Sequence, residues 1–196
     1  MKISHLTLAD KITFLRILLI PLFLVLLLAK NLEPFGPYLA ALVFATAALT
    51  DTVDGFVARI QKKITAFGQF LDPLADKLLI TAALVALVNI NLLALWVALT
   101  IIFREFLVSA LRTYAVAKGK AIPASFLGKL KTVSQILAII VLIINPSFFV
   151  LGKPIGWMLM VLALCLTIFS GGEFLIWYFP SLRSSRGVHS NTLLKD

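Results

Sequence analysis

Long apolar runs, each about as long as a membrane-crossing helix, constrain this chain more than any other feature. A spanning helix needs about 20 consecutive, predominantly apolar residues. Six runs approach that length, and short polar or charged segments separate them. The runs are Ile12–Ala29, Tyr38–Ala58, Phe70–Val88, Leu92–Ala117, Leu127–Ile144 and Ile155–Phe179. The sequence therefore predicts an all-α, polytopic membrane protein with six transmembrane helices.

The composition argues against a soluble globular protein. Of the 196 residues, 61% are hydrophobic and only 14% are charged, and the mean hydropathy is +1.03. A soluble domain of this length exposes more surface than so few charged residues could cover. We find no internal repeat, so we expect a single membrane domain over residues 1–182 and a polar C-terminal tail over residues 183–196.

The distribution of Lys and Arg predicts how the chain crosses the membrane. If the N-terminus is cytoplasmic, nearly all basic residues between the apolar runs fall on the cytoplasmic side, and the outer loops hold only Lys30 and Lys153. This asymmetry obeys the positive-inside rule for an even number of helices, with both termini cytoplasmic. The net charge of +9 then faces the anionic leaflet of the membrane, and no nucleic-acid partner is needed to explain it.

Four of the nine acidic residues gather in the segment "DTVDGFVARIQKKITAFGQFLDPLADK". Asp51 and Asp54 are three residues apart, and Asp72 and Asp76 are four apart, so on helices each pair shares one face. If the second helix begins near Tyr38, Asp51 lies about 20 Å along it. Ionised groups inside the membrane layer are costly, and they mark a functional site by default.

The chemistry of this acidic segment favours divalent metal ions bound next to a phosphate. Four adjacent carboxylates repel one another unless cations are present, and two divalent ions would neutralise them. Oxygen ligands favour Mg²⁺ or Mn²⁺. Small residues at Gly55, Ala58 and Gly68 allow another molecule to approach the backbone, and Arg59 is placed to meet a phosphate. These features together indicate phosphoryl chemistry on a pyrophosphate.

Two other interpretations of the acidic segment stay open at this point. The acids could pair with Lys62, Lys63 and Lys77 at a helix end, as a structural ion-pair network. They could instead relay cations in an ion-coupled transporter, because the argument from depth in the membrane applies equally to that class.

The spacing of the acidic segment resembles the signature of the CDP-alcohol phosphotransferase family. The pattern D-x-x-D-G-x-x-A-R, eight residues, G-x-x-x-D-x-x-x-D runs from Asp51 to Asp76 and matches at all eight fixed positions. The segments "KITFLRILLIP", "REFLVSALR" and "LGKLKT" further resemble the bacterial phosphatidylglycerophosphate synthases of this family. Asp10 stands where many of those synthases have Asn.

The resemblance implies a polar active-site cavity that is open to the cytoplasm and holds two divalent ions. By this resemblance, Asp51 and Asp72 would bridge both ions, Asp54 would bind the first, and Asp76 would bind the second. Asp76 would also be the catalytic base that deprotonates the acceptor alcohol. The CDP-binding residues carried over from the resemblance are Asp10, Thr13, Gly55, Ala58, Arg59, Thr65 and Gly68.

The implied reaction transfers the phosphatidyl group of CDP-diacylglycerol to sn-glycerol 3-phosphate and releases CMP. The resemblance also implies a homodimer in the inner (cytoplasmic) membrane, surrounded by membrane lipids. The same transfer to another acceptor, namely an inositol phosphate, inositol or serine, is the alternative within the enzyme class. A cation-coupled transporter is the alternative from another class.

A phosphorylated acceptor would need a cationic pocket of its own, because the metal ions would be occupied by the pyrophosphate. Arg104 and Arg112 are eight residues apart, so they lie near one face of the fourth predicted helix. Glu105 is rotated about 100° from Arg104, so we do not expect it to neutralise that arginine fully. Lys129 and Lys131 open the next helix, where the positive-inside rule alone could also explain them. We expect these four basic residues to bind the acceptor's phosphate.

Overall fold

Six helices make up nearly all of the part of the chain that the structure, a computed structural model, describes: residues 8–29, 32, 34–61, 66–117, 126–144, 149–150 and 153–184. The helices are α1 (Leu8–Leu28), α2 (Phe35–Gln61), α3 (Ala66–Asn89), α4 (Leu95–Ala117), α5 (Phe126–Ile144) and α6 (Ile155–Ser184). A short antiparallel hairpin precedes α6 and pairs β1 (Phe149–Val150) with β2 (Lys153–Pro154). The predicted number of helices is therefore confirmed for these residues.

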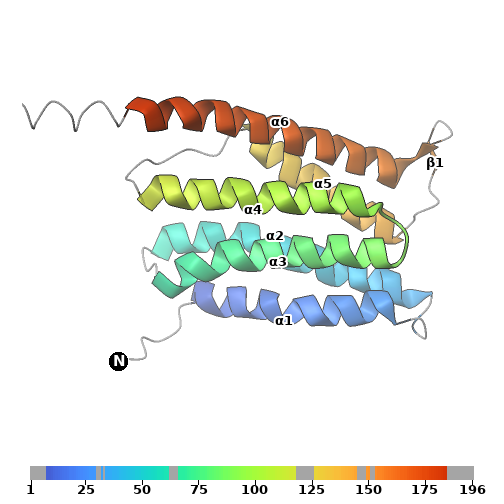
Figure 1. Cartoon of the computed structure of the whole chain (residues 1–196). Coiled ribbons are helices and arrows are strands. Elements are labelled where there is room, and N and C mark those ends of the chain that lie inside the picture. Colours follow the sequence, from blue (N-terminus) through green and yellow to red (C-terminus); the bar gives the residue numbers. More distant parts are fainter. Residues whose placement is uncertain are drawn as a thin grey trace, which may run out of the picture.

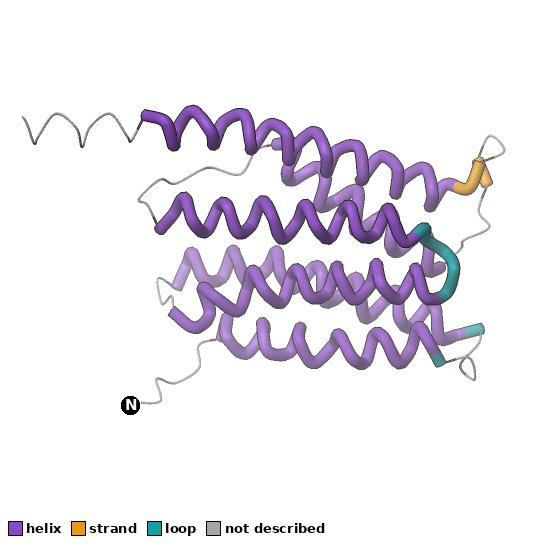
Figure 2. Tube along the Cα trace, viewed as in Figure 1, coloured by secondary structure: helices purple, strands orange, loops and turns teal. Residues whose placement is uncertain are grey.

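Successive helices run in opposite directions along one bundle. The start of α1 and the end of α6 lie at the same end of the bundle, and the α3–α4 turn and the hairpin lie at the other end (Figure 1). The helices account for almost the whole trace, with loops confined to the bundle's ends (Figure 2). Most of the packing is between α5 and α6 and between α1 and its neighbours α2 and α3.

The helix boundaries differ from the predicted runs by a few residues. The predicted break at residues 89–91 is confirmed, because α3 ends at Asn89 and Asn91 has a φ of 60°, a left-handed conformation that Asn adopts more readily than most residues. The turn lasts longer than predicted, so α4 begins at Leu95 rather than Leu92. The last helix continues to Ser184, two residues beyond the predicted domain boundary. The hairpin was not predicted, since two-residue strands leave no alternating pattern.

Small residues let the helices approach closely. In lipid, helices associate through van der Waals packing, because the surrounding chains are as apolar as the side chains. The buried face of α2 carries several alanines around Phe44, whose ring centroid lies 5.6 Å from that of Phe23 on α1. At Gly156 on α6, an added Cβ would lie only 2.8 Å from the Leu142 side chain of α5. Close backbone approach thus holds α5 against α6.

The outer surface of the bundle is apolar. Side chains such as Phe103, Phe126 and Ile176 are at least 70% exposed. Among the described residues, two helical segments are long and apolar enough to cross a membrane by length and composition, Phe126–Ile144 and Ile155–Ile176. Soluble monomers rarely expose apolar patches of this extent, whereas lipid would cover them.

Candidate active site

The structure places the four signature aspartates on two neighbouring helices. Asp51 and Asp54 lie on α2, and Asp72 and Asp76 lie on α3, so the three- and four-residue spacings do fall within helices. Of these side chains only that of Asp76 is among the described residues. The same limit applies to most of the predicted CDP-binding residues: the side chains of Asp10, Ala58 and Arg59, the surroundings of Gly55 and Gly68 and the whole of Thr65 lie outside the described part.

Asp76 lines a small pocket between α3, α4 and α5. Thr81 from the same helix, Glu105 from α4 and Thr132 from α5 also line it, together with apolar side chains and Lys77. Asp76 is half-buried. The carboxyl group predicted to be the base therefore shares a cavity with residues of the two helices that carry the predicted acceptor-binding cations.

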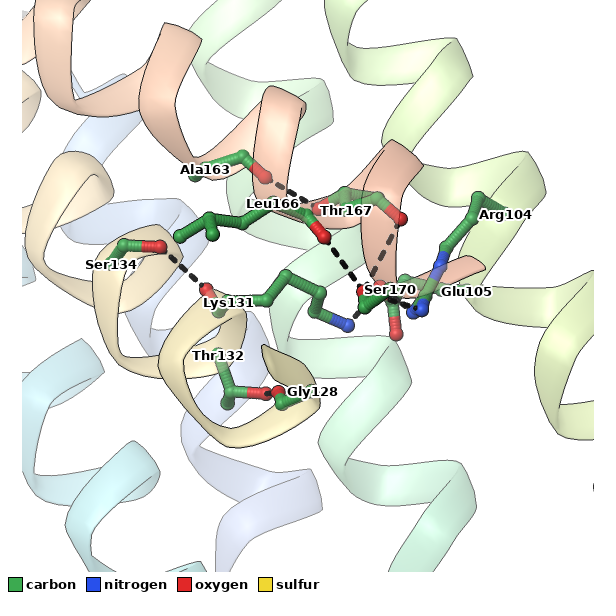
Figure 3. Close-up of polar contacts among 10 residues, drawn as sticks. All are labelled: Arg104, Glu105, Gly128, Lys131, Thr132, Ser134, Ala163, Leu166, Thr167 and Ser170. Atoms are coloured by element: carbon green, nitrogen blue, oxygen red, sulfur yellow. Dashed lines mark hydrogen bonds and ion pairs between the residues drawn. The ribbon is translucent and has the colours of Figure 1, made fainter. Parts of the chain in front are cut away.

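Arg104, Glu105, Lys131 and Ser170 form a polar group that we call the Glu105 cluster (Figure 3). One carboxylate oxygen, Glu105 Oε1, accepts hydrogen bonds from Lys131 Nζ and from Arg104 Nη1, the latter at 3.3 Å. Arg104 Nη2 donates to Ser170 Oγ on α6 at 2.8 Å. Side chains of α4, α5 and α6 thus join in one polar group, in which Glu105 links α4 to α5 and Arg104 links α4 to α6.

The Glu105 cluster retains capacity for an anionic ligand. Two cationic groups share one carboxylate, so one positive charge is not compensated within the cluster. Arg104 Nε is buried and has no hydrogen-bond partner among the described residues. A buried donor without a partner costs roughly 1–3 kcal/mol, which the two other hydrogen bonds of the arginine offset. Lys131 is only 5% exposed, which strengthens its interaction with any anion that enters.

Glu105 does contact Arg104, but it does not neutralise it fully, because Lys131 shares the same carboxylate. The 100° offset separates the two Cβ directions, but both side chains are long enough to bend toward each other along the helix surface. Glu105 also interacts with Lys131, a partner 26 residues away that no helical periodicity could reveal. Its role was missed because the only sequence signal was its position next to Arg104.

The two other predicted acceptor-binding residues, Arg112 and Lys129, have different surroundings. Arg112 lies over the Phe174 ring, with its guanidinium carbon 5.7 Å from the ring centroid. Phe174 follows Ser170 by one turn of α6, so Arg104 and Arg112 contact the same face of α6. Both arginines therefore lie near one face of α4, as their spacing of eight residues predicts. Lys129 is exposed, two residues before the buried Lys131, and the structure does not bring it into the Glu105 cluster.

Two polar side chains of α1 are buried inside the bundle. Thr13, a predicted CDP-binding residue, is 1% exposed, and Arg16, one turn later, is also 1% exposed. Arg16 was not among the predicted site residues, although an arginine inside an apolar run was the signal that could have identified it.

Comparison with known proteins adds independent information about the chain. A protein-family model described as CDP-alcohol phosphatidyltransferase matches residues 6–169. A CDP-diacylglycerol–glycerol-3-phosphate 3-phosphatidyltransferase of Bacillus subtilis is 39% identical over 189 residues, which cover 91% of this chain and 98% of the relative. Proteins of the same description from Pseudomonas fluorescens and Escherichia coli K12 are 40% and 41% identical, over 88% and 84% of this chain and 90% of each relative.

Proposed function

The chain belongs to the CDP-alcohol phosphatidyltransferase family, and we propose that within it the protein is a phosphatidylglycerophosphate synthase. It is an enzyme of phospholipid biosynthesis with membrane helices. The proposed reaction transfers the phosphatidyl group of CDP-diacylglycerol to sn-glycerol 3-phosphate. The products are phosphatidylglycerophosphate and CMP.

The observation that carries this choice of acceptor is the Glu105 cluster beside the Asp76 pocket. Glu105 belongs to both, so the group predicted to remove a proton and the cations that could bind a phosphate border one space. Serine and inositol carry no phosphate, so neither brings the dianion that the excess positive charge of the cluster favours. A phosphorylated acceptor supplies that charge, and the relatives, which are described as acting on glycerol 3-phosphate, favour it over an inositol phosphate.

The residues of the signature fit a pair of hard divalent cations. The four carboxylates on α2 and α3 offer only oxygen ligands at helical spacing, the donor set that Mg²⁺ and Mn²⁺ prefer. We assign Asp51, Asp54, Asp72 and Asp76 to hold them. When bound, two such ions would hold the pyrophosphate and stabilise the oxygen that leaves with CMP.

The chain's own residues then perform the transfer in one displacement. Asp76 accepts the proton of the acceptor's hydroxyl, and the resulting alkoxide attacks the β-phosphorus of CDP-diacylglycerol. A P–O bond to the acceptor forms as the pyrophosphate P–O bond breaks, and CMP takes the electron pair. Arg104, Lys131 and Arg112 hold the acceptor's phosphate, and arginine's planar fork can bind two of its oxygens. This fixes the hydroxyl next to Asp76 and turns an encounter of two molecules into a step within one complex.

We also propose that all six helices cross the inner membrane, with both termini and the active-site cavity on the cytoplasmic side. The distribution of basic residues supports this orientation. The position of the start of α1 and the end of α6 at one end of the bundle is consistent with it (Figure 1). We expect a homodimer, as implied by the family.

An acceptor screen tests the proposed function. Purified protein is supplied with CDP-diacylglycerol and divalent metal, and CMP release is measured with glycerol 3-phosphate, an inositol phosphate, inositol or serine. We expect release with glycerol 3-phosphate to exceed that with each other acceptor by at least about tenfold, with Asp76→Asn protein giving the background rate. Preference for another acceptor would assign a different synthase of the family. No release with any acceptor would contradict the proposed function.

A further inference from the structure

The Arg104 side chain packs against α6 at Gly171. A Cβ added at Gly171 would lie 3.1 Å from Arg104 Nε and 3.4 Å from its Cγ. At the adjacent Gly172, an added Cβ would meet no atom within 4 Å. Two neighbouring glycines of one helix therefore differ sharply, because only Gly171 makes room for the arginine.

Ser170 holds the end of the same side chain. Its hydroxyl donates to the Leu166 carbonyl oxygen at 2.7 Å, one turn earlier in α6, which directs the oxygen's lone pairs toward Arg104. Arg104 Nη2 donates to Ser170 Oγ at 2.8 Å. Arg104 Nη1 donates to Glu105 Oε1 at 3.3 Å. The guanidinium is thus fixed at both Nη atoms, by the contacts to Ser170 and Glu105 (Figure 3). The side chain also packs against Gly171.

We propose that Ser170 and Gly171 form a seat that positions Arg104 for the acceptor's phosphate, and that Gly171 thereby sets the affinity for the acceptor. The inference rests on the proposed function. A methyl group at position 171 would push the guanidinium by a few tenths of an ångström, because 3.1 Å is shorter than an ordinary contact between carbon and nitrogen. Such a shift loosens the Ser170 hydrogen bond and reorients the guanidinium, whose geometry determines how well a phosphate oxygen is bound.

A role in helix packing alone makes a different prediction. If Gly171 only lets α4 approach α6, a methyl group would lower stability and affect both substrates to the same degree. In the proposed seat, the displaced atoms belong to a flexible side chain, so the fold tolerates the methyl group. Replacing glycine by alanine inside a helix even favours the helix by roughly 0.5–1 kcal/mol. Stability and acceptor affinity should therefore change independently.

The test compares Gly171→Ala with Gly172→Ala, the same change one residue along. For each protein, kcat, the KM for glycerol 3-phosphate, the KM for CDP-diacylglycerol and the Tm are measured. We expect Gly171→Ala to raise the KM for glycerol 3-phosphate by about tenfold, with the KM for CDP-diacylglycerol and the Tm close to wild type. Gly172→Ala should leave both KM values within about twofold. Equal KM values for the two variants would overturn the proposal.

A double-mutant cycle checks that Gly171 acts through Arg104. Arg104→Lys removes the guanidinium and its Nε, so adding Gly171→Ala to it should raise the acceptor KM by less than about twofold. If the effects of the two changes on the acceptor KM were fully additive, the proposal that Gly171 acts through Arg104 would be contradicted. Ser170→Ala provides a second variant and should raise the acceptor KM selectively. Failure of wild-type protein in the acceptor screen would instead refute the proposed function, so the two failures are distinguishable.

Discussion

The acidic segment of α2–α3 and the Glu105 cluster differ in how their charges are compensated. The four aspartates carry charges of one sign on two adjacent helices. The basic residues near them in sequence, Arg59, Lys62, Lys63 and Lys77, are none of them three or four residues from an aspartate, the spacing of an ion pair within a helix. The Glu105 cluster contains its own counter-charge, since one carboxylate binds both Arg104 and Lys131. Like charges paired on one helix face without counter-charges at the same spacing repel one another, and multivalent cations relieve that repulsion. In the Glu105 cluster, the carboxylate already compensates part of the positive charge.

This comparison assigns each region to one substrate. The acidic segment would serve the nucleotide's pyrophosphate through the divalent ions, and the Glu105 cluster would serve the acceptor's phosphate. Perturbing one region should then alter the kinetic constant of one substrate and spare the other. The largest effects should come from the acidic segment, because without its ions or its base no chemical step can take place.

Removal of divalent metal should have the largest effect. With excess chelator, four aspartates lose the cations that offset their mutual repulsion and that would hold the pyrophosphate, so CMP release should fall to background. Added Mg²⁺ or Mn²⁺ should restore it, which also controls for irreversible denaturation. Unchanged turnover in excess chelator would remove the basis for a binuclear site.

Asp76→Asn should be next in magnitude. The amide cannot accept the acceptor's proton, so we expect kcat to fall by roughly 10³–10⁴, in the range of a lost general base. Binding of CDP-diacylglycerol should remain measurable, since three carboxylates of the signature are intact. A matched Asp196→Asn change at the end of the chain should have no effect. If the Asp76 variant kept near-normal kcat, another residue would have to be the base.

A pair of lysine variants tests the other region with a smaller effect. Lys131 is buried against Glu105, and Lys129 is exposed two residues earlier on the same helix. Lys131→Ala should raise the KM for glycerol 3-phosphate by roughly tenfold or more, about 1.4 kcal/mol per factor of ten. Lys129→Ala should change it by less than about threefold. Similar effects in both variants would mean that general positive charge near the membrane, and not a defined pocket, attracts the acceptor.

Much of the fold could be predicted from the sequence because membrane-spanning length is a local property. Six apolar runs give six helices, and the break near Asn89 follows from polar residues that fit a turn. The errors in the predicted fold lie at the ends of the helices. Backbone hydrogen bonding continues a helix past the last apolar residue, as at Ser184, and polarity alone does not determine where α4 begins.

The candidate site, like the fold, contains residues that could be identified from the sequence and residues that could not. The aspartates could be identified because their spacing repeats with the period of one helix. The partners of Arg104 could not be identified. Glu105 is rotated about 100° from it on the helix, and Ser170 is 66 residues away. Lys129 and Lys131 look equivalent in sequence, and only the packing of α5 against its neighbours separates the buried from the exposed lysine. Interactions between helices depend on register and tilt, which apolar patterning does not encode.

The most direct test of the central claim removes the phosphate from the acceptor and the guanidinium from the enzyme, singly and together. The quantity measured is the ratio of kcat/KM for glycerol 3-phosphate to that for glycerol, in wild-type protein and in Arg104→Ala. If the Glu105 cluster binds the acceptor's phosphate, wild type should discriminate by roughly 10³ or more, as sites with buried polar groups do. The variant should lose most of that ratio while its activity toward glycerol stays nearly unchanged. An unchanged ratio in Arg104→Ala would contradict the account.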